Sequence, residues 1–204
     1  HSQDALTVRA LLMKLWRAHF VLLVAALTWQ PVLAQAAASG ATDPTPFAEL
    51  LKATRFIENY KETAAVSARV FAARGQGSDK EYAAFMATVA SSDLSDMASC
   101  LSLAYASGPL TATDARELVA IFRTPIGLKV IDLSQRWNLT NIERGSVQPM
   151  DPSLLSDRER TELSRLYQRP VFARYNATVA SEPLAAATRA CLGSSKVARG
   201  AGVK

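Results

Sequence analysis

The chain has very little histidine. Of its 204 residues only His1 and His19 are histidines, and both lie near the amino terminus. A chain processed beyond residue 34 would retain neither, which excludes Ser-His-Asp and Cys-His catalysis and histidine-ligated metal sites within one chain. We therefore expect no catalytic residue of these classes, no metal site and no cofactor.

The sequence also lacks a long apolar run. The longest candidate, residues 20–29, has about half of the ~20 residues that a membrane-spanning helix needs. It follows a basic segment at residues 13–17 and precedes small residues around Ala34, which is the layout of a secretory signal peptide. We predict a signal-peptide region at residues 1–34, cleavage after Ala34 and a true start at Met13. The alternative is an apolar first helix of a soluble core.

This interpretation places the mature protein in the periplasm or outside the cell, with no permanent membrane span. Removal of residues 1–34 takes away three cations (Arg9, Lys14 and Arg17) and one anion (Asp4), so the net charge falls from +5 to +3. Nucleic acid is then a poor candidate partner, because the remaining chain has no basic stripe that would attract a phosphate backbone.

Cysteine is almost as scarce as histidine. The two cysteines, Cys100 and Cys191, both lie among apolar residues on predicted helices. In an oxidising compartment, two cysteines in one domain favour a disulfide. The alternative is a pair of buried free thiols.

The alternation of apolar and polar residues that marks β-strands is nearly absent. Alanine-rich segments with apolar residues three and four positions apart predict an all-α bundle that forms a single domain at residues 35–192. We expect a first helix from Asp43 to Arg74, a capping box at residues 78–81 and a helix restarting at residues 91–93. A last helix should run from Ser181 to Leu192, followed by a flexible tail at residues 193–204.

What the chain does contain is a duplicated segment. Residues 110–130 are repeated at residues 155–175, with an offset of 45 positions. The members of four pairs are identical: Leu110/Leu155, Glu117/Glu162, Leu118/Leu163 and Pro125/Pro170. Six further pairs are conservative: Thr111/Ser156, Asp114/Glu159, Ile121/Leu166, Phe122/Tyr167, Ile126/Val171 and Lys129/Arg174.

The shared positions are those that begin a helix, bury one of its faces and break it. Thr111 and Ser156 should be N-caps, each with an acid three residues later. Pro125 and Pro170 should interrupt the helix or open a new one. Each copy is therefore expected to form a helix, a break and a second helix. A polar connector at residues 138–152 should join the two copies.

The first copy carries a pattern beyond these folding signals. Phe122, Thr124, Pro125, Gly127 and Lys129 follow a capped helix that contains Glu117-Leu118. This motif resembles the signature of a bacterial family of exported proteins, domain-of-unknown-function family number 2059. Arg123 departs from the residue usual in that family, and Phe172 stands in the second copy where Gly127 stands in the first. The resemblance implies an all-helical exported domain and brings no catalytic residues with it.

Five residues are candidates for a binding surface: Phe122, Pro125, Gly127, Lys129 and Tyr167. For Phe122 and Tyr167 the alternative to a ligand groove is the core. For Gly127 it is close helix packing. Lys129 and its counterpart Arg174 could bind an anion or simply extend along the surface.

Two classes of function follow. The first is a noncatalytic envelope module that binds a protein, peptide or lipid. The second is a cell-wall hydrolase that uses the repeat-equivalent acids Glu117 and Glu162, which would have to face each other across a cleft about 5–10 Å wide. The alternative for these acids is solvation, or pairing with a nearby cation.

Overall fold

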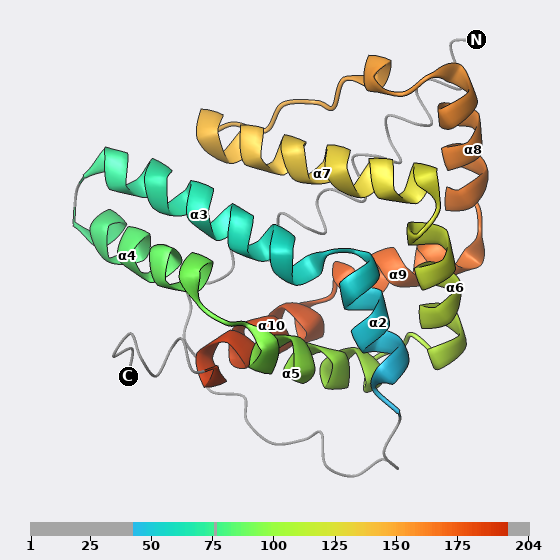
Figure 1. The fold of residues 1–204 in the computed structure, drawn as a ribbon, viewed down its shortest axis with the longest axis horizontal. Coiled ribbons are helices and arrows are strands. Elements are labelled where there is room, and N and C mark those ends of the chain that lie inside the picture. Colours follow the sequence, from blue (N-terminus) through green and yellow to red (C-terminus); the bar gives the residue numbers. More distant parts are fainter. Residues whose placement is uncertain (1–42, 76, 196–204) are drawn as a thin grey trace.

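A computed structural model of the chain describes residues 43–75 and 77–195. Over these residues the fold is all-α, as the sequence predicts (Figure 1). The signal-peptide region, Met13 and Ala34 lie outside the described residues. The helices are α2 (Thr45–Ala53), α3 (Phe56–Arg74), α4 (Ser78–Ser91), α5 (Ser95–Ala106), α6 (Ala112–Phe122), α7 (Pro125–Arg144), the 3₁₀ turn η2 (Pro152–Leu154), α8 (Asp157–Tyr167), α9 (Pro170–Val179) and α10 (Glu182–Ser194).

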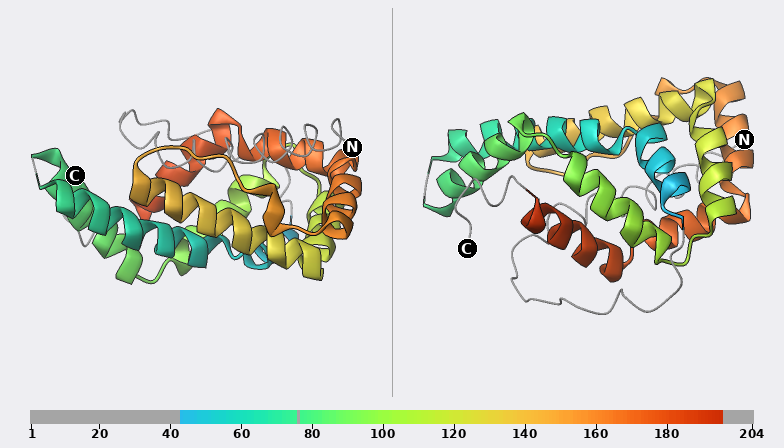
Figure 2. Two further views of the ribbon diagram at one scale, coloured as in Figure 1. Left: turned by 90° about the horizontal axis from the view of Figure 1, so that it is seen from above. Right: turned by 60° about the horizontal axis from the view of Figure 1, so that its bottom comes forward.

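The helices form an elongated bundle. The hairpin of α3 and α4 extends to one side, and α7 lies along α3 (Figures 1 and 2). At the other end α6, α8 and α9 pack around the start of α7, while α5 and α10 lie together along one edge. The main core is centred on apolar side chains that are almost completely buried, including Phe47, Met97, Leu101 and Leu118.

The first predicted helix is wrong in one respect, because it is two helices. The chain turns at Thr54–Arg55, where Arg55 adopts a left-handed conformation with φ of 53°. The Thr54 hydroxyl donates to the carbonyl oxygens of Leu50 and Leu51, at 3.0 and 3.1 Å, and so satisfies groups at the helix end. The Arg55 guanidinium reaches Asp132 on α7 at 2.9 Å. These contacts stabilise a break that helix periodicity alone does not reveal.

Other boundaries also differ from the prediction. The capping box expected at residues 78–81 does not form, because Ser78 is already helical and its N-cap, Gly77, makes no side-chain cap. The connector is shorter than residues 138–152, because α7 continues to Arg144 and ends at Gly145 with φ of 64°. Asn138 donates to Thr63 on α3 at 3.2 Å, so packing against α3 outweighs the turn preference of this segment.

The two cysteines form the predicted disulfide. Cys100 on α5 and Cys191 on α10 are bonded, with Cα atoms 5.6 Å apart, a separation typical of disulfides. The last helix begins at Glu182, directly after Ser181, which is its N-cap, and continues two residues past Leu192 to Ser194, so the expected tail begins in helical conformation. None of the described helices combines the length and apolar composition that a membrane crossing requires.

Candidate functional site

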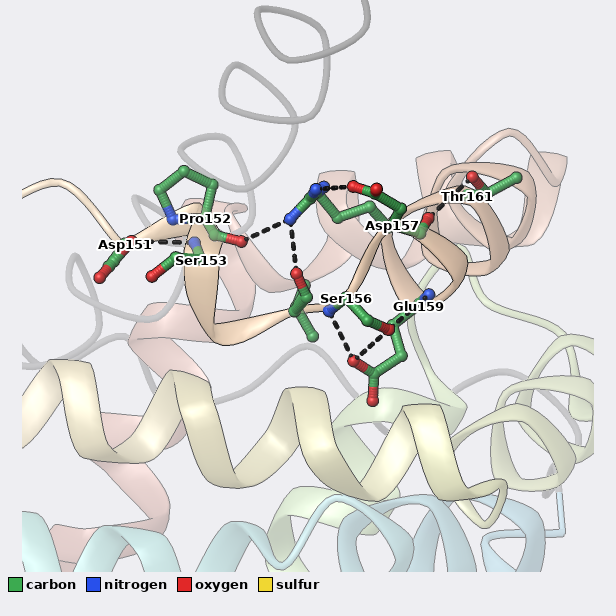
Figure 3. A network of polar contacts seen from close by, with 9 residues as sticks. Asp151, Pro152, Ser153, Ser156, Asp157, Glu159 and Thr161 are labelled. Atoms are coloured by element: carbon green, nitrogen blue, oxygen red, sulfur yellow. Dashed lines mark hydrogen bonds and ion pairs between the residues drawn. The ribbon is translucent and has the colours of Figure 1, made fainter.

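Both copies of the duplicated segment begin with the predicted capping box. In α6 the Thr111 hydroxyl accepts from the Asp114 N–H at 3.1 Å, and the Asp114 carboxylate accepts from the Thr111 N–H at 3.0 Å. In α8 Ser156 and Glu159 make the same exchange at 3.3 and 2.8 Å (Figure 3). The acid that the two copies share therefore lies in the first turn of each helix and completes its cap, as the sequence pattern indicates.

The prolines also act alike in the two copies. Pro125 and Pro170 are the first residues of α7 and α9, where a missing N–H leaves no helical hydrogen bond unmade. Thr124 caps α7 by accepting from the Gly127 N–H at 3.1 Å, whereas Arg169 at the equivalent place caps nothing. Each copy is thus a capped helix, a break and a second helix.

Gly127 lies where the first bend is tightest. A Cβ atom at this position would stand 2.3 Å from the Ile121 carbonyl oxygen and 2.7 Å from the Phe122 Cα atom. Both are backbone atoms, which cannot move aside as a flexible side chain can. The prediction that Gly127 permits close packing of the bend agrees with this geometry.

Charged residues of each copy form ion pairs with those of the other copy. Arg174 of the second copy binds Asp114 of the first, with N–O distances of 2.5 and 3.3 Å. Lys129 of the first copy binds Glu159 of the second, with Nζ–O distances of 2.7 and 2.8 Å. Because these residues are equivalent in the repeat, one contact pattern occurs twice in reciprocal form. We call these two ion pairs the cross-brace.

The cross-brace and the caps act together on the acids. Hydrogen bonding from Arg174, and then from Thr111, lowers the pKa of Asp114 from 3.8 to about 2. Hydrogen bonding from Lys129, and then from Ser156, lowers the pKa of Glu159 from 4.5 to about 2. Both acids are held in the charged state, so neither can serve as a proton donor near neutral pH.

Aromatic rings fill the space between the copies. Phe122 meets Phe172 and Tyr175 edge-on, with ring centroids 5.9 and 5.7 Å apart. Tyr167 lies 4.8 Å from the Phe172 ring. Burial raises the pKa values of Tyr167 and Tyr175 well above their ordinary value. Phe172, which replaces the glycine of the first copy, is thus the ring that joins the equivalent residues Phe122 and Tyr167.

The five predicted binding residues therefore occupy different environments. Phe122 and Gly127 are buried, and Tyr167 is partly buried against the main core. Pro125 is exposed at the bend, and Lys129 is half-buried in its ion pair with Glu159. Phe122 and Tyr167 meet through Phe172, whereas Pro125 and Lys129 lie outside this aromatic cluster.

The two repeat-equivalent acids do not share an environment. Glu117 binds Arg169 through an Nη2–Oε1 contact of 2.9 Å, while Glu162 is exposed on α8. Within residues 43–75 and 77–195, no group of three or more acids or cysteines is arranged to hold a metal ion. Glu117 is thus paired with a cation, which is the alternative that the sequence left open for it.

The sequence did not indicate that two side chains of α7 bind the backbone of the connector. The Trp137 indole donates to the Gln148 carbonyl oxygen, and the Asn141 side-chain oxygen accepts from the Gln148 N–H at 2.8 Å. Trp137 and Asn141 are one helical turn apart on α7, so they hold both backbone polar groups of one connector residue. Trp137 is therefore a partly exposed anchor for the chain's own connector.

A second candidate site lies at the break between α2 and α3. There a pocket of about 200 Å³ opens between these helices and α5. Its lining is mainly apolar, with Leu51, Ile57 and Ala98 among its residues, and it also includes Ser102. Lys52 and Glu58 contribute opposite charges to the lining and are exposed. No sequence motif marks this site, which lies beside a helix break that the sequence pattern does not show.

Comparisons of the chain with protein-family models, with curated proteins and with solved structures give no match. What these two sites can bind or catalyse therefore follows from their own residues.

Proposed function

We propose that the chain is an exported protein of the bacterial cell envelope that works as a noncatalytic binding module for a protein, peptide or lipid. The exported location follows from the signal-peptide pattern at residues 1–34 and from the resemblance to family number 2059. The disulfide between Cys100 and Cys191 supports it, because structural disulfides form and persist in oxidising compartments.

The cross-brace is the observation that carries the noncatalytic part of the proposal. Four charged residues that the two copies share, besides Glu117 and Glu162, could have served a repeated active site. Asp114, Glu159, Lys129 and Arg174 are instead bound to one another. A general acid or base needs a pKa near the operating pH, and the two acids have pKa values of about 2. The segment is better suited to holding the bundle rigid than to proton transfer.

Fractionation of cells that express the full chain tests the proposal. We expect the processed protein in the periplasmic or secreted fraction, with both cysteines protected from alkylation until a reductant is added. Purification from that fraction, followed by mass spectrometry of proteins and lipids, should recover a bound partner. Recovery of unprocessed protein from the cytoplasm with two free thiols would contradict the proposed location.

A different measurement distinguishes the hydrolase alternative from the noncatalytic binding module. Purified protein incubated with peptidoglycan should release no soluble fragments above the background without protein. Release that disappears in the Glu117→Gln/Glu162→Gln variant would overturn the noncatalytic proposal. Arg116→Gln is a matched control, because it changes an exposed charge on the same helix as Glu117.

A further inference from the structure

The pocket between α2, α3 and α5 lies beside a strained turn. Arg55 is the one non-glycine residue with positive φ among residues 43–75 and 77–195. It lies between the helices that supply Lys52 and Glu58 to the pocket. A left-handed conformation costs an ordinary residue about 1 kcal/mol or more, and such strain gathers at functional sites. The turn separates α2 from α3 where both line the pocket.

The charges of the pocket are not used by the fold. Other charges near the same turn are paired, as at Arg55–Asp132 and Arg123–Glu49. Lys52 and Glu58 form no ion pair or side-chain hydrogen bond with any described residue. An ammonium and a carboxylate therefore stand in the lining of one small pocket with their hydrogen-bonding capacity free.

Ser102 is a third polar residue of the lining. The Ser102 side chain is buried, and its hydroxyl donates to the carbonyl oxygens of Ala98 and Ser99, each at 2.9 Å. Because its proton is committed to the helix, the oxygen can act toward a ligand only as an acceptor. Ser102 and Glu58 can thus both receive hydrogen bonds from a cation, whereas Lys52 can donate to an anion.

The size of the pocket limits the ligand. Sites for drug-sized molecules occupy roughly 300–1,000 Å³, whereas an apolar cavity of about 150 Å³ holds benzene. At about 200 Å³ this pocket fits a molecule slightly larger than benzene. Leu51, Ile57 and Ala98 offer a wall for a short apolar group.

We propose that this pocket binds a small zwitterion, namely a free α-amino acid with a short apolar side chain. Its carboxylate binds Lys52, its ammonium binds Glu58 and the Ser102 oxygen, and its side chain packs against Leu51 and Ile57. The inference deepens the proposed binding role by naming a site and a ligand class, and it rests on that role but not on export.

The test is an NMR titration of the ¹⁵N-labelled, disulfide-bonded chain with L-valine. Isovalerate, which lacks the ammonium, and isobutylamine, which lacks the carboxylate, are the matched ligands. We expect valine to shift amide signals at residues 48–58 and 98–102. Each matched ligand should bind about tenfold more weakly or worse, because it leaves one charged hydrogen-bonding group without a partner.

Variants locate the site. Lys52→Met and Glu58→Gln should each weaken valine binding by about tenfold. Lys80→Met should leave it unchanged, because Lys80 is an exposed lysine on α4. The amide spectrum of each variant also reports directly whether it is folded.

Three results would overturn the inference. They are equal binding of isovalerate and valine, shifts away from the pocket, and no shift at roughly 10 mM valine, a concentration well above a millimolar Kd. Any of these would leave the fractionation result unaffected. Recovery of the protein from the cytoplasm would equally leave the titration unaffected, so the two proposals can fail separately.

Discussion

Replacement of Gly127 with alanine is expected to lower the free energy of unfolding by about 3 kcal/mol, the upper part of the range for overpacked sites. The added methyl group would meet the Ile121 carbonyl oxygen at 2.3 Å and the Phe122 Cα atom at 2.7 Å. Relief requires the end of α6 to move away from the start of α7. Such a movement disturbs Phe122, whose ring contacts Phe172 and Tyr175.

Urea denaturation of the variant and the wild type measures this loss. Gly193→Ala is the matched control, because an added Cβ there meets nothing within 4 Å and the residue lies in α10. Alanine favours a helix over glycine by up to about 1 kcal/mol, so the control should lose no stability. If Gly127→Ala stayed within about 0.5 kcal/mol of the wild type, the bend would not be close-packed.

Loss of the disulfide should have an even larger effect. Cys100 and Cys191 are 91 residues apart, and closing a loop of that length stabilises the folded state by about 4–5 kcal/mol on the chain-entropy model. The Cys100→Ser/Cys191→Ser variant should lose most of this stability. The loss of stability should be largest in α10, because this helix packs mainly on α5 and buries small side chains such as Ala185.

Chemical denaturation with and without a dithiol reductant measures the contribution of the disulfide. The wild type should unfold at a much lower denaturant concentration when reduced, and should then resemble the double-serine variant. That variant should not respond to the reductant, which makes it the control for other effects of the reagent. Coincident curves for oxidised and reduced wild type would mean that the bond contributes nothing to stability.

Local signals in the sequence predict much of the fold. The caps at Thr111 and Ser156 and the helix starts at Pro125 and Pro170 are each decided within a few residues, so they are visible without a structure. The disulfide was predictable because the chain has only two cysteines and a signal-peptide pattern. The all-α class follows from apolar spacing that repeats along the whole described chain.

The errors lie where distant contacts override local preference. The break at Arg55 is accompanied by a contact with Asp132, 77 residues away, and the extension of α7 by a contact of Asn138 with Thr63 on α3. Neither contact can be predicted from the residues next to it in the sequence. The pocket at Lys52 and Glu58 lies beside that break, so the sequence pattern did not indicate the pocket either.

The cross-brace could be predicted from the sequence only in part. The repeat aligns Asp114 with Glu159 and Lys129 with Arg174, so each copy carries one acid and one cation at fixed positions. That pattern is a usable signal for reciprocal pairing between copies. Sequence alone does not distinguish it from pairing within each copy, or from two solvated charges. The structure assigns each cation to the acid of the other copy.

The cross-brace has a defined pH dependence. Folding lowers the pKa of Asp114 from 3.8 and that of Glu159 from 4.5, in each case to about 2. A carboxyl whose pKa is lowered by folding stabilises the folded state above its unfolded pKa. That contribution is lost as the pH falls through the folded pKa. It is therefore complete above about pH 4.5 and disappears as the pH approaches 2.

The most direct test of the reciprocal cross-brace is an NMR titration of the carboxyl carbons of Asp114 and Glu159 in the wild type, Arg174→Met and Lys129→Met. In the wild type both pKa values should be about 2. Arg174→Met should raise the pKa of Asp114 alone, and Lys129→Met that of Glu159 alone. Wild-type values near 3.8 and 4.5, or a shift in the acid of the same copy as the lost cation, would contradict the exchange of charges between the copies.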